Sequence, residues 1–173
     1  MQKRTTHSKI LFKDTSFPEN VFPPIVVAYN IKTPENIGNI IRLADNFGCA
    51  EVIIVSNDGN VRKSKIKKTA VSSIESVKWS ICDPSELTSK IPDGYKMVSI
   101  ETSSDSKNIF NTVLPGKAVF IVGNEIEGLA NDILNISDCI IHIPLYGKNS
   151  SMNVSHALAV VLFEWQRNRN IGL

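Results

Sequence analysis

The chain has 173 residues, of which 42% are hydrophobic and 21% are charged. These values are ordinary for a globular protein, and the length suits one domain whose core needs no disulfide bonds. The composition excludes a disordered chain, a collagen and a coiled coil, and a net charge of +2 does not by itself indicate nucleic-acid binding.

No feature of the sequence indicates secretion or membrane insertion. The three cysteines, Cys49, Cys82 and Cys139, are widely spaced and form no CxxC pair, so we expect reduced core residues. The basic N-terminal segment, residues 1–24, lacks the apolar run of a signal peptide, and the longest apolar run, Ala157 to Phe163, is too short to span a membrane. We expect a cytoplasmic protein with no metal site and no membrane partner.

Short β-branched runs alternate with helical segments along the chain. Several of these runs are apolar almost throughout, which is typical of strands covered on both faces. The pattern predicts a single α/β domain over residues 25–173, built on a mostly parallel sheet with helices on both faces. The predicted strands are 25–29, 51–55, 77–81, 96–100, 118–122 and 139–143.

The first helix has clear start and stop signals. Thr33 and Pro34 suit the N-cap and first helical positions, Asn36 is a second capping candidate, and Gly48 suits the position after the last turn. Arg42 falls outside the apolar stripe that should pack on the sheet. That stripe consists of Ile37, Ile40, Ile41, Ala44 and Phe47.

The last helix is predicted over about residues 154–167 and is apolar on two sides. One stripe includes Leu158, Leu162 and Trp165, and a second includes Val160 and Phe163. Such a helix must cover its own core and something else as well. A partner subunit is the simplest explanation, and a fully internal helix is the alternative.

Positive charge is concentrated between residues 62 and 68. Such a run is often only a solvated face, but in an otherwise balanced chain it is also typical of a patch that contacts RNA phosphates. Both interpretations stay open. The five charged residues are Arg62, Lys63, Lys65, Lys67 and Lys68.

The common signatures of phosphate loops, dinucleotide sites, zinc proteases and serine hydrolases are absent. Three other polar segments follow predicted strands, where open α/β sheets bind their ligands. Taken singly, each could be a cap, a turn or a helix entry, although the last also offers helix N–H groups beside Ser150 and Ser151 to an anion. The segments are 36–42, 122–128 and 143–153.

Together and in this order, the segments resemble the three motifs of the SpoU family, the ribose 2′-O-methyltransferases of the SPOUT superfamily. The resemblance covers about residues 25–168. Met152 stands where the family has leucine, a change that conserves volume. The matching residues are Asn36, Gly38, Arg42, Ala44 and Phe47-Gly48; then Gly123-Asn-Glu125 and Glu127-Gly-Leu129; then Ile143-Pro144, Gly147 and Ser151-Met-Asn-Val-Ser155.

The resemblance implies an α/β fold whose C-terminal segment forms a deep trefoil knot that binds S-adenosylmethionine, largely through backbone groups. It implies homodimers packed through the terminal helices, in agreement with the two apolar stripes. It also implies an RNA substrate, with tRNA favoured over rRNA because short members of the family mostly act on tRNA. The positions that correspond to the cofactor site are Ile100, Glu101, Thr102, Gly123, Ile143, Leu145 and Met152.

Methyl transfer to a ribose hydroxyl requires alignment of O2′ with the methyl group and removal of a proton. The resemblance assigns this step to Arg42, although a pKa above ~12 makes arginine a poor base. It could serve only if the RNA phosphate and neighbouring groups steer its proton away, or if it merely polarises the hydroxyl. In this reading Asn36 and Glu125 orient Arg42. Ser151 and Asn153 fix the substrate or the cofactor, and Lys148 in the third segment is the alternative base.

Three alternatives remain. The chain could methylate rRNA instead of tRNA, or it could be a non-catalytic RNA-binding dimer of the same fold. A SPOUT enzyme that methylates a base nitrogen is the third, but such enzymes usually rely on an aspartate, and the NxGxxxR pattern from Asn36 to Arg42 speaks against it.

Overall fold

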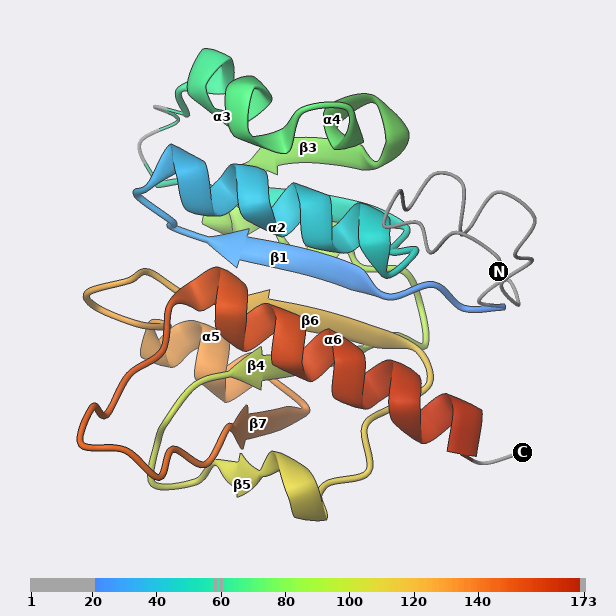
Figure 1. Cartoon of the computed structure of the whole chain (residues 1–173), viewed down its shortest axis with the longest axis vertical. Helices are drawn as coiled ribbons and strands as arrows, with labels where there is room; N and C mark the ends of the chain where they lie inside the picture. The colour runs from blue at the N-terminus through green and yellow to red at the C-terminus, as the bar shows by residue number, and fades with distance from the viewer. Residues whose placement is uncertain (1–20, 58, 60, 172–173) are drawn as a thin grey trace, which may run out of the picture.

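The computed structural model describes residues 21–57, 59 and 61–171, so most of the basic N-terminal segment lies outside it. The described chain forms one α/β unit of seven strands and five helices (Figure 1). The strands are β1 (Ile25–Tyr29), β2 (Glu51–Val55), β3 (Lys78–Cys82), β4 (Lys96–Ile100), β5 (Lys107–Asn108), β6 (Ala118–Val122) and β7 (Cys139–His142). The helices are α2 (Pro34–Asn46), α3 (Lys63–Ala70), α4 (Ser73–Ser76), α5 (Asn131–Ile136) and α6 (Val154–Ile171).

The strands form a single sheet in the order β3-β2-β1-β6-β4-β7-β5, and all the pairings between them are parallel in the part of the chain described. The predicted mostly parallel α/β architecture is therefore confirmed. Because parallel strands all end at the same edge of a sheet, the loops that follow β1, β6, β4 and β7 are brought together there.

The structure differs from the predicted strands at the sheet's edges. β3 begins one residue later than expected, because Lys78 pairs with Glu51 across to β2, and Glu51 also accepts a hydrogen bond from Ser80. The two-residue strand β5 was missed, since Lys107 and Asn108 have no apolar pattern and are strand only through their pairing with β7. β7 itself ends one residue early, at His142.

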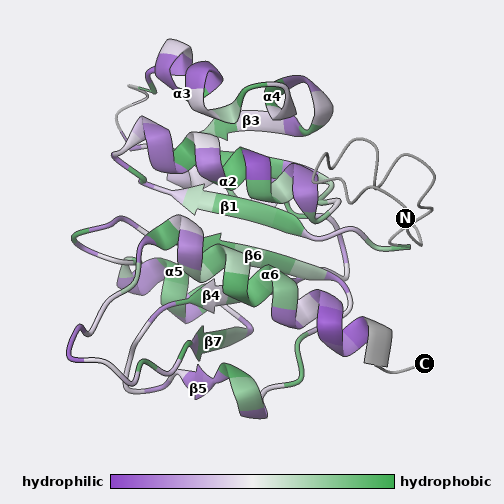
Figure 2. Cartoon of the chain, in the orientation of Figure 1, coloured by the Kyte–Doolittle hydropathy of each residue, from purple (hydrophilic) through white to green (hydrophobic). Residues whose placement is uncertain are grey.

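Helices cover both faces of the sheet. On one face α2, α3 and α6 pack over alternate strand residues such as Val26, Val52 and Phe120. On the other face the intervening residues, such as Val27 and Ile121, pack against Ile133 of α5 and against short 3₁₀ turns. Figure 2 shows hydrophobic residues along the central strands and hydrophilic residues gathered on α3.

The stripe predicted for the last helix is buried, and the second stripe is not. Trp165 is almost fully buried, and its indole N–H donates to the carbonyl oxygen of Pro115 at 2.9 Å. Val160 and Phe163 remain 39% and 62% exposed. The helix runs to Ile171, past the predicted end, and no helix in the described residues is long and apolar enough to cross a membrane.

Helices α2 and α3 approach each other closely at Gly38. A β-carbon added at Gly38 would lie 2.5 Å from Cβ of Thr69 and 3.1 Å from the backbone nitrogen of Ala70. These atoms belong to the helix itself and cannot rotate away. The glycine in the first motif therefore permits α3 to dock on α2.

We predict that Gly38→Ala lowers the free energy of unfolding by about 1–3 kcal/mol, as overpacking does in well-packed cores. Helix propensity alone predicts the opposite sign, because alanine is favoured over glycine by about 1 kcal/mol inside a helix. Urea unfolding measures the difference, with Asn39→Ala on the same helix as the control. A Gly38→Ala variant more stable than the wild type would contradict the close packing.

Candidate active site

A cleft of about 430 Å³ lies beyond the ends of β4, β6 and β7. This volume is in the usual range for small-molecule sites. The loops after the three strands and the start of α6 form its walls, so segments more than 50 residues apart in sequence share one site. We call it the cofactor cleft, because all seven positions that the family resemblance assigned to the cofactor line it: Ile100, Glu101, Thr102, Gly123, Ile143, Leu145 and Met152.

Glu101 has a structural role that the sequence did not indicate. Its carboxylate accepts hydrogen bonds from the backbone N–H of Leu129, at 2.9 Å, and from that of Thr102, at 2.8 Å. It thereby ties the loop after β4 to the second motif. Glu101 therefore lines the cleft as predicted, but its carboxylate is bonded to the protein's own backbone.

Gly123 is required by its own loop. A β-carbon there would lie 2.6 Å from the carbonyl carbon of Gly128 and 2.7 Å from the nitrogen of Leu129. The loop folds back on itself through paired backbone hydrogen bonds between Asn124 and Gly128. A larger residue at Gly123 would therefore distort the loop before it met any ligand.

Asn36, Glu125 and Asn153 form a hydrogen-bonded chain that joins the three motifs. The Asn36 side chain donates from Nδ2 to Glu125 Oε1 at 2.8 Å. It also accepts, through Oδ1, a hydrogen bond from Asn153 Nδ2 at 3.1 Å. Asn36 is buried and so does not cap α2 as the sequence suggested; its amide links the second and third motifs instead.

Glu125 lies at the junction of the second motif with the start of α2. Its carboxylate also accepts hydrogen bonds from the backbone N–H groups of Lys32, at 3.2 Å, and Thr33, at 3.3 Å. Partial burial alone would raise the pKa of Glu125, but the hydrogen bonds from Asn36, Lys32 and Thr33 outweigh it and lower that pKa. Glu125 is therefore held as a carboxylate.

The start of α6 is not the open anion site that the sequence suggested. Asn153 caps the helix: its Oδ1 accepts hydrogen bonds from the N–H groups of Ser155, at 2.9 Å, and His156, at 3.4 Å. These donors are therefore already used. Ser150 and Ser151 are exposed and line the cofactor cleft beside this cap.

Arg42 lies on the solvent side of α2, as its position off the apolar stripe predicted. It has no hydrogen bond or ion pair with any residue that the structure describes, and it does not line the cofactor cleft. The structure shows no hydrogen bond from Asn36 or Glu125 to Arg42, and the side chains of Asn36 and Glu125 are bonded to other partners. Lys148 is also exposed.

The basic run forms the start of α3, with Arg62 as its N-cap residue. All five charged side chains are exposed, whereas Ile66 and Ala70 are buried against α2. The run thus forms a solvated surface of α3, and none of its residues lines the cofactor cleft. Within the described residues, no group of histidine, cysteine and carboxylate side chains could hold a metal ion.

Asn124 lines the cleft and holds the second motif together, a role that was not predicted from the sequence. It is buried, and its Oδ1 accepts hydrogen bonds from the backbone N–H groups of Ile126 and Glu127 at 2.8 and 3.0 Å. Its Nδ2 donates to the carbonyl oxygen of Asn30 at 2.9 Å. An asparagine before a glycine-containing turn is a known signal for such local bonding and could have indicated it.

We predict that Asn36→Asp destabilises the fold at neutral pH by about 1–3 kcal/mol, since the introduced carboxylate would face Glu125 without a donor between them. The repulsion requires both groups to be ionised. The loss of stability should therefore shrink as the pH falls toward and below 4.5, the ordinary pKa of a glutamate such as Glu125.

Urea unfolding at pH 7 and at acid pH tests this prediction. The control is Asn39→Asp, which adds the same charge to α2 at a side chain with no hydrogen bond among the described residues. Equal losses in the two variants, or a loss independent of pH, would contradict a direct Asn36–Glu125 contact.

Comparisons with known proteins identify the family. The model of the SpoU rRNA Methylase family matches residues 23–163. The "tRNA (guanosine(18)-2'-O)-methyltransferase" of Aquifex aeolicus is 31% identical over 150 residues, which cover 84% of this chain and 69% of that protein. The "23S rRNA (guanosine-2'-O-)-methyltransferase RlmB" of Neisseria meningitidis is 25% identical over 96% of this chain and 66% of its own length.

The fold agrees with a solved structure of the same kind. The A. aeolicus TrmH/SpoU tRNA modifying enzyme superposes with a TM-score of 0.77 at 28% identity, over 89% of this chain and 79% of that one. The resemblance inferred from the three motifs is thereby confirmed. The chain belongs to the SpoU rRNA Methylase family.

Proposed function

We propose that this chain transfers a methyl group from S-adenosylmethionine to a ribose 2′-hydroxyl of RNA, with tRNA as the favoured substrate. One observation carries the proposal: the cleft beyond β4, β6 and β7 gathers every predicted cofactor position beside the linked side chains of Asn36, Glu125 and Asn153. Relatives that are named as tRNA and rRNA 2′-O-methyltransferases support the reaction type.

The cleft has the chemistry that the methyl donor requires. The apolar side chains of Ile100, Ile143 and Met152 line the cleft together with Gly123, so an adenosine group could be packed against side chains and hydrogen-bonded to backbone at once. When bound, S-adenosylmethionine supplies an electrophilic methyl group. The protein's part is to hold the ribose O2′ in line with that group and to exclude water.

Removal of the hydroxyl proton is assigned to Arg42. Its guanidinium is exposed and has no partner among the described residues, which leaves its donors available to an RNA phosphate. A protonated guanidinium has no acceptor, so Arg42 can take the hydroxyl proton only after the phosphate and neighbouring groups have drawn a proton from it. Arginine suits this task because its planar fork can hold two oxygen atoms together. Ser151 and Asn153, at the cleft, are assigned to positioning the substrate.

The RNA is held by the exposed face of α3. Arg62, Lys63, Lys65, Lys67 and Lys68 provide charge for contacts to the backbone, which do not depend on sequence. The choice of tRNA over rRNA rests on the family resemblance and on the Aquifex relative, whereas the Neisseria relative represents the rRNA alternative. Cytoplasmic location is part of the proposal and is supported by three free cysteines.

The trefoil knot is also part of the proposal. β7 lies in the sheet between β4 and β5, although the chain passes from β4 through β5 to β6 before it reaches β7. The segment 101–117 thus leads out to the edge and back around the position that β7 occupies. The chain after β7 then leads to α6, where the Trp165 indole donates a hydrogen bond to Pro115 at the end of the same segment. This path of the chain supports a C-terminal segment threaded through the loop 101–117.

A homodimer through α6 is proposed because Val160 and Phe163 are exposed on that helix. Leu145, Tyr146 and Met152, in the loop that leads to α6, are exposed as well. Apolar side chains gathered in this way on one helix and its entry loop are typical of an interface. A second copy of the chain fits the family resemblance.

The test of activity is direct. The purified chain is incubated with S-adenosylmethionine that carries a labelled methyl group and with unmodified tRNA or rRNA, and the digested nucleosides are identified by mass spectrometry. The proposal expects a labelled 2′-O-methylnucleoside from tRNA without added metal. A labelled base would indicate the base-methylating alternative, and no label in either RNA would favour the non-catalytic dimer.

We predict that Arg42→Ala reduces turnover by a factor of ~10² to 10⁴, the usual loss for a general base. Stability and cofactor affinity should stay near the wild-type values, because the side chain is exposed and outside the cleft. Arg42→Lys should fail as well, since an ammonium lacks the guanidinium fork. Single-turnover rates and calorimetry with S-adenosylhomocysteine measure the two quantities.

The matched control is Asn46→Ala, an exposed position at the end of the same helix. If Arg42→Ala keeps more than about a tenth of the wild-type rate, a loss below ~1.4 kcal/mol, the arginine does not act on the hydroxyl. Lys148→Ala is then the next variant to assay.

We predict that Phe163→Glu converts a dimer into monomers, because a charge placed in an apolar interface is left without a partner. Light scattering at micromolar concentration gives the mass. Phe110→Glu is the control, since Phe110 is 64% exposed, close to the 62% of Phe163, but lies outside α6. A wild-type monomer, or a Phe163→Glu variant that stays dimeric, would rule out this interface.

A further inference from the structure

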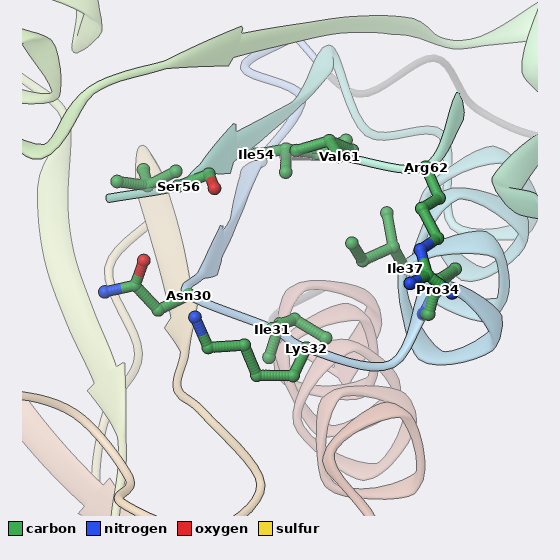
Figure 3. Close-up of a pocket in the computed structure, with 10 residues that line it drawn as sticks. Asn30, Ile31, Lys32, Pro34, Ile37, Ile54, Ser56, Val61 and Arg62 are labelled. Atoms are coloured by element: carbon green, nitrogen blue, oxygen red, sulfur yellow. The ribbon is translucent and has the colours of Figure 1, made fainter. Parts of the chain in front are cut away.

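A second pocket lies at the same edge of the sheet as the cofactor cleft and has no assigned role. It has a volume of about 270 Å³ and lies between the ends of β1 and β2 and the starts of α2 and α3 (Figure 3). It shares no lining residue with the cofactor cleft. The two sites meet at Lys32, whose backbone N–H donates to Glu125 at 3.2 Å. We call this second site the β1–β2 pocket.

The β1–β2 pocket combines apolar walls with positive charge. Pro34, Ile37 and Val61 are among its aliphatic walls, and Lys32 and Arg62 are its two cations. No carboxylate is among the ten described residues that line it. Figure 3 shows the Arg62 side chain reaching from the start of α3 toward Pro34, while Lys32 extends toward Asn30. A ligand with a flat, partly apolar ring and an anionic group matches these walls.

Asn30 supplies a fixed polar group at the end of the β1–β2 pocket. Its backbone has a φ of 52°, a left-handed conformation that asparagine tolerates better than most residues. Its N–H donates to Val55 at 2.9 Å, and its carbonyl oxygen accepts from Asn124 Nδ2 at 2.9 Å. Its Oδ1 accepts a hydrogen bond from the N–H of Asn57 at 3.0 Å. These three bonds fix the residue.

The Asn30 Nδ2 group, in contrast, has no partner among the residues that the structure describes. Figure 3 shows this nitrogen on the side of Asn30 that faces away from Pro34, Ile37 and Val61, so Asn30 forms the polar end of the pocket and not part of its apolar wall. Left-handed backbone of this kind is found often at ligand sites, where the surrounding hydrogen bonds maintain it.

We propose that the β1–β2 pocket receives one nucleotide of the RNA, a neighbour in sequence of the nucleotide whose ribose is methylated. Its base packs against Pro34, Ile37 and Val61, and its phosphate lies on Arg62. The inference rests on the proposed function. It makes the walls of the pocket determinants of which RNA is accepted.

The location favours a nucleotide within RNA over a free nucleotide. Arg62 is at once a pocket residue and the first of the five charges on the exposed face of α3. On the opposite side, the pocket borders Glu125 and hence the cofactor cleft. A strand that follows the α3 charges toward the cleft therefore has to cross the β1–β2 pocket.

Methyl NMR of the full chain tests the proposal without relying on turnover. Methyl groups of isoleucine and valine are labelled, the cofactor cleft is saturated with S-adenosylhomocysteine, and the chain is titrated with the RNA oligonucleotide that it modifies or, failing turnover, with tRNA. We expect shifts at Ile37 and Val61 on RNA addition. Ile100 and Ile143, in the cofactor cleft, report the first ligand separately.

Two variants test the assigned contacts. Asn30→Asp keeps the acceptor for Asn57 and the tolerance of positive φ, but adds a negative charge to a pocket whose cations are Lys32 and Arg62. Arg62→Ala removes the phosphate contact and should weaken RNA binding about tenfold. Both should raise KM for RNA, leave S-adenosylhomocysteine affinity unchanged and reduce the shifts at Ile37 and Val61. Lys63→Ala, one residue along, removes the same charge but should leave those shifts intact.

The outcomes separate the alternatives. Absence of shifts at Ile37 and Val61 with bound RNA, or equal effects of Arg62→Ala and Lys63→Ala on them, overturns the inference. Shifts produced by a 5′-mononucleotide but not by RNA would also overturn it, in favour of a free nucleotide. If RNA shifts these methyl groups but no methyl transfer occurs, the proposed function fails and the binding site stands.

Discussion

The Asn36 carboxamide is the contact on which the arrangement of the site depends. A carboxamide both donates and accepts, and Asn36 uses both capacities: its nitrogen binds Glu125 and its oxygen accepts from Asn153. These partners lie 89 and 117 residues further along the chain. One side chain on the first turn of α2 thus joins the loop after β6 and the start of α6 to α2. Neither aspartate nor a hydrophobic residue of the same size could make both bonds.

From this contact the edge of the sheet divides into two sites. The loops after β4, β6 and β7 form the cofactor cleft on one side of Glu125, and the ends of β1 and β2 form the β1–β2 pocket on the other. Glu125 accepts backbone hydrogen bonds from Lys32 and Thr33, which belong to the segment between the two. Glu101 and Asn124 hold the second motif in the same way, by accepting backbone N–H donors. The loops are therefore pre-organised by side chains that need no ligand.

Much of this could be predicted from the sequence, because apolar runs of five residues specify parallel strands and a 3.6-residue repeat specifies the buried face of α2. The grouping of the cofactor positions followed from the order of the three motifs. What could not be predicted depends on partners distant in the chain. β5 exists only through β7, β3 shifts because Glu51 binds Lys78 and Ser80, and the carboxylate of Glu101 is used by Leu129. The role of Asn153 as the cap of α6 likewise depends on the N–H group of Ser155 and was not predicted.

The contrast between the two kinds of polar residue explains how the site is built. Asn36, Glu125, Asn153 and Asn124 are bonded within the protein, so their hydrogen bonds already hold the loops in place. Arg42 and the charges of α3 are exposed and have no ion pairs among the described residues, so they gain partners only when an anion arrives. An arginine that must act on a hydroxyl gains from this separation, because a carboxylate partner would hold its proton more tightly. The protein thus fixes the loops in advance, and in the proposed function the hydroxyl is activated only when the phosphates of the RNA reach Arg42.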